Sequence, residues 1–162
     1  MLTALSSIAS QQSASTAEKI KGVKQFFDYC ASQEDEITNF RKSNMELLVH
    51  IDAGYLNYLK SQRRAGGNFY MSNSSPIPPN NGAVITISQI IKAVMSSAAE
   101  AELGALFIYT REAVYMRQIL EYMGHKQGQT LIQTDNSIAE GFIKRKIEPK
   151  HTKRMDMRFH WL

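Results

Sequence analysis

The order of the hydrophobic patterns along this chain constrains its fold more than any other feature. Three short runs rich in apolar and β-branched residues, at 47–53, 65–71 and 83–91, have the length of β-strands. A helical period follows from Ser97, which with Glu100 forms a capping-box pattern, up to Gly124, and residues 130–135 form a fourth strand candidate. The pattern predicts an α/β fold: a meander of three antiparallel strands, then helix, strand and helix, in a mixed sheet whose first and fourth strands can be neighbours.

Residues 1–44 are expected to form a helical leader before the sheet. Ser15 followed by Glu18 is a possible capping box that opens a helix over residues 17–31. The apolar face of this helix would consist of Ile20, Val23, Phe26, Phe27 and Cys30. We therefore divide the chain into this leader and a domain over residues 45–162.

Two further helices are predicted after the fourth strand. Residues 137–146 and 152–162 have helical patterns, and Pro149 separates them. Residues 144–158 carry a concentration of positive charge, at Lys144, Arg145, Lys146, Lys150, Lys153, Arg154 and Arg158. A solvated helix face would explain such a run, whereas its position directly after the fourth strand favours contact with phosphate groups.

Three acidic residues occupy positions from which their side chains can meet. Asp52 and Asp135 lie at the ends of the first and fourth predicted strands, and strand ends are where ligands bind in α/β sheets. Glu102 lies in the first turns of the long helix, on the side expected to face the sheet. Taken singly, each residue could merely end a strand or begin a helix. Together they predict a magnesium site for the cleavage of nucleic acid.

Composition excludes several other classes of protein. A chain of 162 residues can hold one domain with a real core, and no run approaches the roughly 20 apolar residues that would cross a bilayer. The single cysteine, Cys30, permits no internal disulfide and favours a reducing, cytoplasmic compartment. The four histidines and the cysteine do not have zinc-ligand spacing.

Four motifs resemble the RNase H domain at the end of the reverse transcriptase polyprotein of copia-type retrotransposons. Residues 50–53 (His-Ile-Asp-Ala) resemble the Ser-Asp-Ala signature of that family, and residues 96–103 (Ser-Ser-Ala-Ala-Glu-Ala-Glu-Leu) its Ser-Ser-Thr-Glu-Ala-Glu-Tyr helix start. Residues 134–137 (Thr-Asp-Asn-Ser) match its Asp-Asn pair, and residues 152–160 (Thr-Lys-Arg-Met-Asp-Met-Arg-Phe-His) are similar to its Thr-Lys-His-Ile-Asp-Ile-Arg-Tyr-His segment. The leader resembles the tail of the preceding polymerase portion.

The resemblance implies an RNase H-like fold and hydrolysis of the RNA strand of an RNA/DNA hybrid. It makes Asp52, Glu102 and Asp135 ligands of two Mg²⁺ ions, with Mn²⁺ as a substitute, and it selects Glu102 rather than Glu100. Asn136 would touch the RNA strand or cap the next helix. The expected partners are the hybrid and the remainder of the polyprotein, in the cytoplasm and within retroelement particles. The positions expected to bind nucleic acid are Asn136, Lys144, Arg145, Lys150 and Lys153.

The chain departs from the family at its C-terminal end. In the family a further strand and a final helix, which carries a fourth carboxylate, follow the segment that resembles residues 152–162. The fourth ligand is therefore expected to be missing, and Asp156 is a candidate to replace it. The alternative function is a non-catalytic, truncated retroelement remnant that retains nucleic-acid binding.

Overall fold

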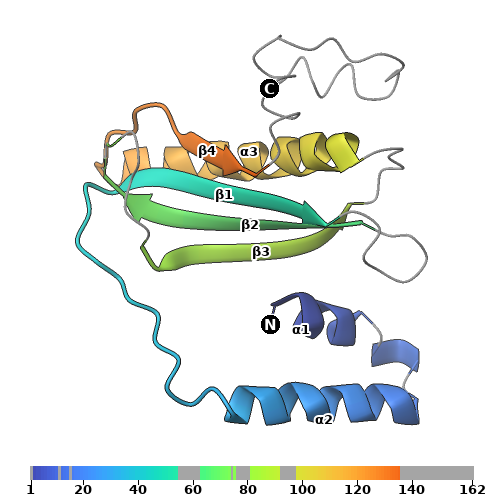
Figure 1. The fold of residues 1–162 in the computed structure, drawn as a ribbon. Coiled ribbons are helices and arrows are strands. Elements are labelled where there is room, and N and C mark those ends of the chain that lie inside the picture. Colours follow the sequence, from blue (N-terminus) through green and yellow to red (C-terminus); the bar gives the residue numbers. More distant parts are fainter. Residues whose placement is uncertain are drawn as a thin grey trace. The chain divides into compact units, whose positions relative to one another are not determined.

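The computed structural model describes residues 2–10, 12–14, 16–54, 63–73, 75, 81–91 and 98–135. The chain divides into two compact units, Met1–Asn39 and Phe40–Leu162. Figure 1 shows the helices and strands of both units.

The first unit is a pair of helices with a short 3-10 turn between them. The helices are α1 (Leu2–Ala9) and α2 (Ala17–Ala31), and the turn covers Gln12–Ala14. The predicted bounds of α2 are confirmed, but its N-cap is Thr16 rather than Ser15. Thr16 has an extended backbone, and its hydroxyl accepts a hydrogen bond from the Lys19 amide three residues later, at 3.4 Å.

The helix α2 contains no buried residue. Val23, Phe26 and Cys30 are half-buried, while the side chains of Ile20 and Phe27 remain 63% and 64% exposed. The predicted apolar face thus exists in this unit without forming a closed core.

The second unit is the mixed α/β arrangement that the sequence predicts. Three strands, β1 (Glu46–Gly54), β2 (Arg63–Ser72) and β3 (Ala83–Ile91), precede the helix α3 (Ala98–Tyr122), and β4 (Leu131–Thr134) follows it. The strand order is β3-β2-β1-β4, with β1 antiparallel to β2, β2 antiparallel to β3, and β1 parallel to β4. The predicted adjacency of the first and fourth strands is confirmed.

The core lies between one face of this sheet and α3, which runs behind the sheet in Figure 1. Alternate residues of β1, namely Leu47, Val49 and Ile51, belong to this core and point to the same side of the strand. The facing side of α3 carries the small residues Ala101 and Ala105, which are fully buried. Small side chains let the helix approach the strands closely, and this places the first turns of α3 near the end of β1.

Tyr109 connects the middle of α3 to the sheet through packing and a hydrogen bond. Its side chain is 0% exposed, and its hydroxyl donates a hydrogen bond to the Ala65 carbonyl oxygen at 2.7 Å. The ring lies over Gly67, where a Cβ atom would come within 2.6 Å of a ring carbon. The glycine in β2 therefore provides the space that this aromatic ring fills.

The end of α3 is set by Gly124, which has φ of +91°. The His125 amide donates to the Leu120 carbonyl and the Gly124 amide to the Glu121 carbonyl, which together form a Schellman motif. A residue with a side chain would be strained at this φ, so Gly124 stops the helix and turns the chain toward β4.

Gln127 then connects this turn to the start of β1. Its side-chain oxygen accepts a hydrogen bond from the Leu47 amide at 3.0 Å, and its side-chain nitrogen donates to the Met45 carbonyl at 2.8 Å. This long-range pair of bonds lies directly before the parallel pairing of β1 with β4 and helps to fix its register.

The described helices include none that is long and apolar enough to cross a membrane. The helices predicted over residues 137–146 and 152–162 lie outside the described residues, and so does Ser97 of the predicted capping box. Those expectations stay predictions.

Candidate metal centre

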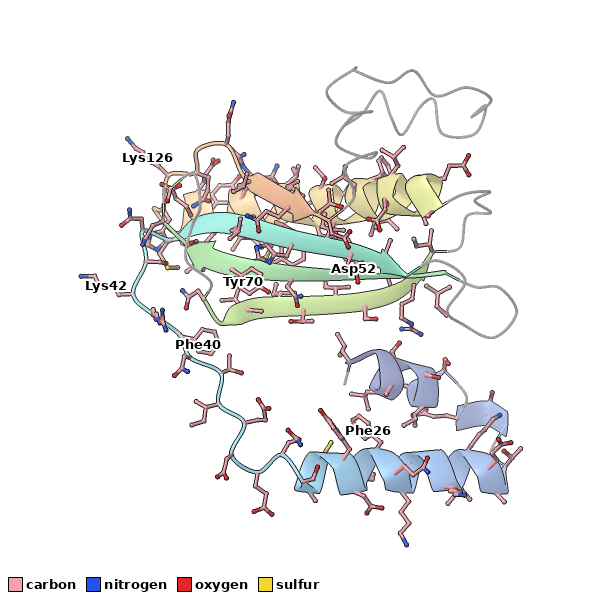
Figure 2. The ribbon with its side chains drawn as sticks, in the orientation of Figure 1. Phe26, Phe40, Lys42, Asp52, Tyr70 and Lys126 are labelled. Carbon is pink, nitrogen blue, oxygen red and sulfur yellow. The ribbon has the colours of Figure 1, made fainter. Side chains whose placement is uncertain are left out.

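Asp52, Glu102 and Asp135 come together at one end of the sheet. Asp52 lies near the end of β1 (Figure 2), Glu102 in the second turn of α3, and Asp135 directly after β4. One carboxylate oxygen of each residue lies within 4.8 Å of the others. The structure therefore brings together the three acidic residues that the sequence pattern predicts to meet.

The parallel pairing of β1 with β4 produces this convergence. Ile51 pairs with Thr134, so the next residue of each strand, Asp52 and Asp135, reaches the same end of the sheet. Glu102 approaches from α3, next to the fully buried Ala101. Three segments that are far apart in sequence thus supply one acidic group each.

Glu102 is the buried member of this group. It is 6% exposed, whereas Asp52 and Asp135 are exposed. Its Oε1 atom accepts a hydrogen bond from the Ala53 amide at 3.3 Å, and its Oε2 atom accepts one from the Thr134 hydroxyl at 3.4 Å. The donors flank the other two carboxylates, since Ala53 follows Asp52 and Thr134 precedes Asp135.

Burial and the neighbouring charges raise the pKa of Glu102 to about 7. Desolvation is the largest cause of this raised pKa, and the negative charges of Asp135 and Asp52 add to it. The hydrogen bonds from Ala53 and Thr134 act in the opposite direction. Without a cation, this group of carboxylates therefore retains a proton close to neutral pH.

The donor set fits a hard divalent cation. Mg²⁺ prefers oxygen ligands at roughly 2.1 Å, so two ligand oxygens on opposite sides of one ion are about 4.2 Å apart. The observed group, within 4.8 Å, is close to that spacing, and two of its members are exposed side chains that can adjust. No histidine or cysteine belongs to the group, which disfavours a zinc site.

We expect divalent cations to bind more tightly as the pH rises toward 7. A cation must displace the proton from Glu102, whose pKa is about 7, so the affinity should fall roughly tenfold for each pH unit below that value and level off above it. Titration with Mn²⁺ from pH 5 to 8.5, followed by electron paramagnetic resonance of the free ion, measures this dependence. The ordinary pKa of a glutamate is 4.5. An affinity that levels off near pH 4.5 would therefore contradict the raised pKa of Glu102.

Glu100 is not a member of the carboxylate group, so the geometry agrees with the choice of Glu102. Asn136, Lys144, Arg145, Lys150 and Lys153 lie outside the described residues, as does Asp156. Their roles in binding nucleic acid or metal stay predictions.

The residues that hold Glu102 were not predicted from the sequence. The signal for Thr134 was present, because alternation along β4 places it on the same side as Ile132, which packs against the core. A hydroxyl at such a position requires a hydrogen-bond partner. No feature of the sequence indicates that the Ala53 amide bonds to Glu102.

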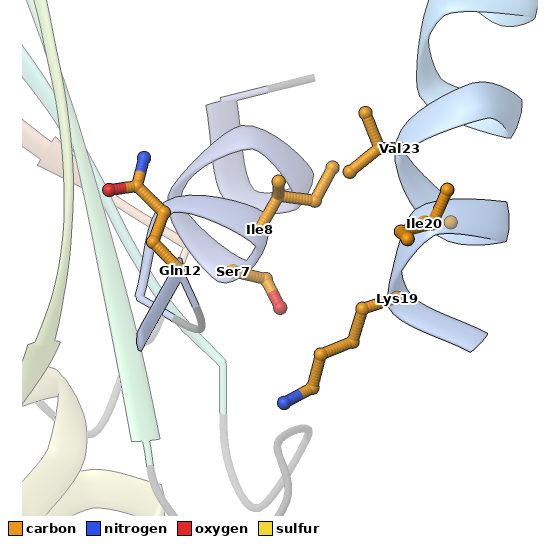
Figure 3. A pocket seen from close by; sticks show the side chains of 7 residues that line it. Ser7, Ile8, Gln12, Lys19, Ile20 and Val23 are labelled. Atoms are coloured by element: carbon orange, nitrogen blue, oxygen red, sulfur yellow. The ribbon is translucent and has the colours of Figure 1, made fainter. Parts of the chain in front are cut away.

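A separate hollow lies between α1 and α2 in the first unit (Figure 3). Its lining includes Ser7, Ile8, Gln12, Lys19, Ile20 and Val23. None of these residues is acidic, so the hollow offers no ligand set for a hard cation.

No protein-family model matches the chain, and no solved structure matches it. The chain is 23% identical over 145 residues to the retrovirus-related Pol polyprotein from transposon TNT 1-94 of Nicotiana tabacum. This match covers 90% of the chain and 10% of the polyprotein, so the chain spans about a tenth of the length of that relative. The similarity supports a retroelement-derived origin for the chain.

Proposed function

We propose that the second unit is an RNase H-like domain that hydrolyses the RNA strand of RNA/DNA hybrids in a metal-dependent reaction. The observation that carries this proposal is the convergence of Asp52, Glu102 and Asp135 from β1, α3 and β4. The order of the strands and the helix supports it, because a meander followed by α3 and a parallel β4 is compatible with an RNase H-like sheet. The similarity to a transposon Pol polyprotein agrees with it.

Asp52, Glu102 and Asp135 would hold two Mg²⁺ ions, which in such a site would activate a water molecule and stabilise the departing oxygen of a phosphodiester. The chain supplies the negative charge that holds them. Asp52 and Asp135 are exposed and accessible to the phosphate backbone of a substrate, while Glu102 is held by two hydrogen bonds below them. Loss of its proton makes Glu102 an anionic ligand beside Asp52 and Asp135.

The substrate would be recognised by its backbone shape and its 2′-hydroxyl groups rather than by base sequence. We propose that Asn136 and the basic residues Lys144, Arg145, Lys150 and Lys153 contact the backbone. The partner in the cell would be the remainder of a reverse transcriptase polyprotein, in the cytoplasm and within retroelement particles.

The test is cleavage of an end-labelled RNA/DNA hybrid by the purified chain, first in Mg²⁺ and then in Mn²⁺. We expect cleavage of the RNA strand of the hybrid, little cleavage of RNA/RNA or DNA/DNA duplexes of the same sequence, and complete loss of activity in EDTA. A folded chain that binds the hybrid without cutting it in either metal would reject the enzymatic proposal and favour a non-catalytic retroelement remnant.

A further inference from the structure

We propose that Thr134 is a positioning residue for the metal site. Its hydroxyl, together with the Ala53 amide, holds the carboxylate of Glu102 in the orientation that faces Asp52 and Asp135. This inference rests on the proposed metal-dependent function. It identifies Thr134 as a residue that orients Glu102 before a cation binds.

The position of Thr134 in β4 is the first argument. Its side chain lies on the same side of the strand as Ile132, which packs against the hydrophobic core. An apolar β-branched residue such as Val would fit a strand at this position as well, and would avoid the cost of removing a hydroxyl from water. The Thr134 hydroxyl instead donates to Glu102 Oε2 at 3.4 Å.

The need for such a hydrogen bond follows from the charges around Glu102. Asp52 and Asp135 both act unfavourably on the ionised form of its carboxylate. Rotation of the Glu102 side chain away from Asp52 and Asp135 would relieve this repulsion. The three carboxylates would then no longer lie together. Hydrogen bonds from the Ala53 amide and the Thr134 hydroxyl favour the ionised carboxylate, so donors at this point oppose the rotation.

The two donors act on different oxygens. The Ala53 amide is bonded to Oε1 at 3.3 Å and the Thr134 hydroxyl to Oε2 at 3.4 Å, so together they fix the rotation of the carboxylate about its last torsion. Each carboxylate oxygen has two acceptor sites, so one site on each oxygen is left for a cation. Glu102 can therefore be held and remain a ligand.

The donors are also the chain neighbours of the other two ligands. Ala53 is adjacent to Asp52 and Thr134 to Asp135, and Ile51 of β1 pairs with Thr134 of β4. Correct pairing of the two strands thus places both aspartates and both donors at once. Thr134 links the register of β4 to the orientation of a ligand that comes from α3.

The test compares Thr134→Val with Thr134→Ser in the full chain. The valine keeps the shape and removes the donor, whereas the serine restores the donor. We expect Mn²⁺ affinity, measured by electron paramagnetic resonance at pH 8, to fall about tenfold in Thr134→Val and to return to within about threefold of the unaltered chain in Thr134→Ser. Thr86→Val is the matched control, because Thr86 is an exposed strand threonine on β3 and should leave the affinity unchanged.

Thermal unfolding in EDTA tests whether Thr134→Val changes the stability of the fold. Because β-branched valine suits a strand, we expect no fall in the midpoint of unfolding. A lower Mn²⁺ affinity then reflects the lost orientation of Glu102. Equal affinity in Thr134→Val and the unaltered chain would overturn the inference while leaving the metal site intact. A serine variant as weak as the valine variant would overturn it too. If the unaltered chain binds no Mn²⁺ that depends on Asp52, then both the inference and the proposed function fail.

Discussion

Glu102→Gln will reduce the proposed hydrolysis of the hybrid by on the order of 10²- to 10³-fold, the usual cost of losing one group that stabilises charge in an active site. Glutamine has nearly the same shape as glutamate but no charge to hold a cation. Asp52→Asn and Asp135→Asn should have the same result. Initial rates of hybrid cleavage at saturating Mg²⁺ measure the effect, with Glu100→Gln as the matched control because Glu100 lies one helical half-turn away and outside the carboxylate group.

Stability measurements distinguish this loss from misfolding. The pKa of Glu102 is raised to about 7 in the folded chain, above its ordinary value of 4.5, so the folded state binds the extra proton and loses stability as the pH rises from about 4.5 to about 7. In EDTA at pH 8 the glutamine variant should therefore unfold at a higher temperature than the unaltered chain, and at pH 4.5 at the same temperature. An inactive variant that is also less stable at pH 8 would point to misfolding instead of a lost ligand.

Gly67→Ala will destabilise the second unit by about 3 kcal/mol, at the upper end of the usual cost of overfilling a core. The added Cβ atom would lie 2.6, 2.8 and 2.9 Å from three carbon atoms of the Tyr109 ring. The ring cannot move aside cheaply, because it is fully buried and its hydroxyl is bonded to the Ala65 carbonyl at 2.7 Å. Urea unfolding followed by circular dichroism measures the change.

The adjacent glycine provides a matched control for this substitution. A Cβ atom at Gly66 would meet only the Asp52 carbonyl oxygen, at the ordinary distance of 3.9 Å. Gly66→Ala should therefore cost less than about 1 kcal/mol. If the two alanine variants are equally stable, the close packing of Tyr109 on β2 does not constrain the fold as described.

The strands and α3 were predictable because their local patterns are strong. Residues 83–91 are rich in β-branched residues, and the helical period before Gly124 ends at the residue whose positive φ stops α3. The N-cap of α2 was harder to predict, because two neighbouring residues can both cap a helix. Serine and threonine both suit an N-cap, and the extended backbone of Thr16 with its bond to the Lys19 amide identifies Thr16 as the cap.

The site was predictable in part, for a related reason. Asp52 and Asp135 each follow from a local pattern plus one assumption, that the first and fourth strands pair. The choice of Glu102 rather than Glu100 follows from the resemblance to the retrotransposon family. The long-range hydrogen bonds of the sheet and of the site depend instead on the pairing of distant segments, which no local pattern contains. Gln127 reaches the start of β1 across 80 residues, and Thr134 reaches Glu102 across 32.

The short length of β4 has a consequence for the temperature at which such a site can work. It pairs with β1 through four residues, whereas β1 pairs with β2 through nine. Strands with few backbone bonds open first on warming, so Thr134 and Asp135 should separate from Asp52 while the meander stays folded. A cation shared by Asp52 and Asp135 would fasten the two strand ends together and delay that opening. Metal supply, as much as the hydrophobic core, would then set the upper limit of the working temperature.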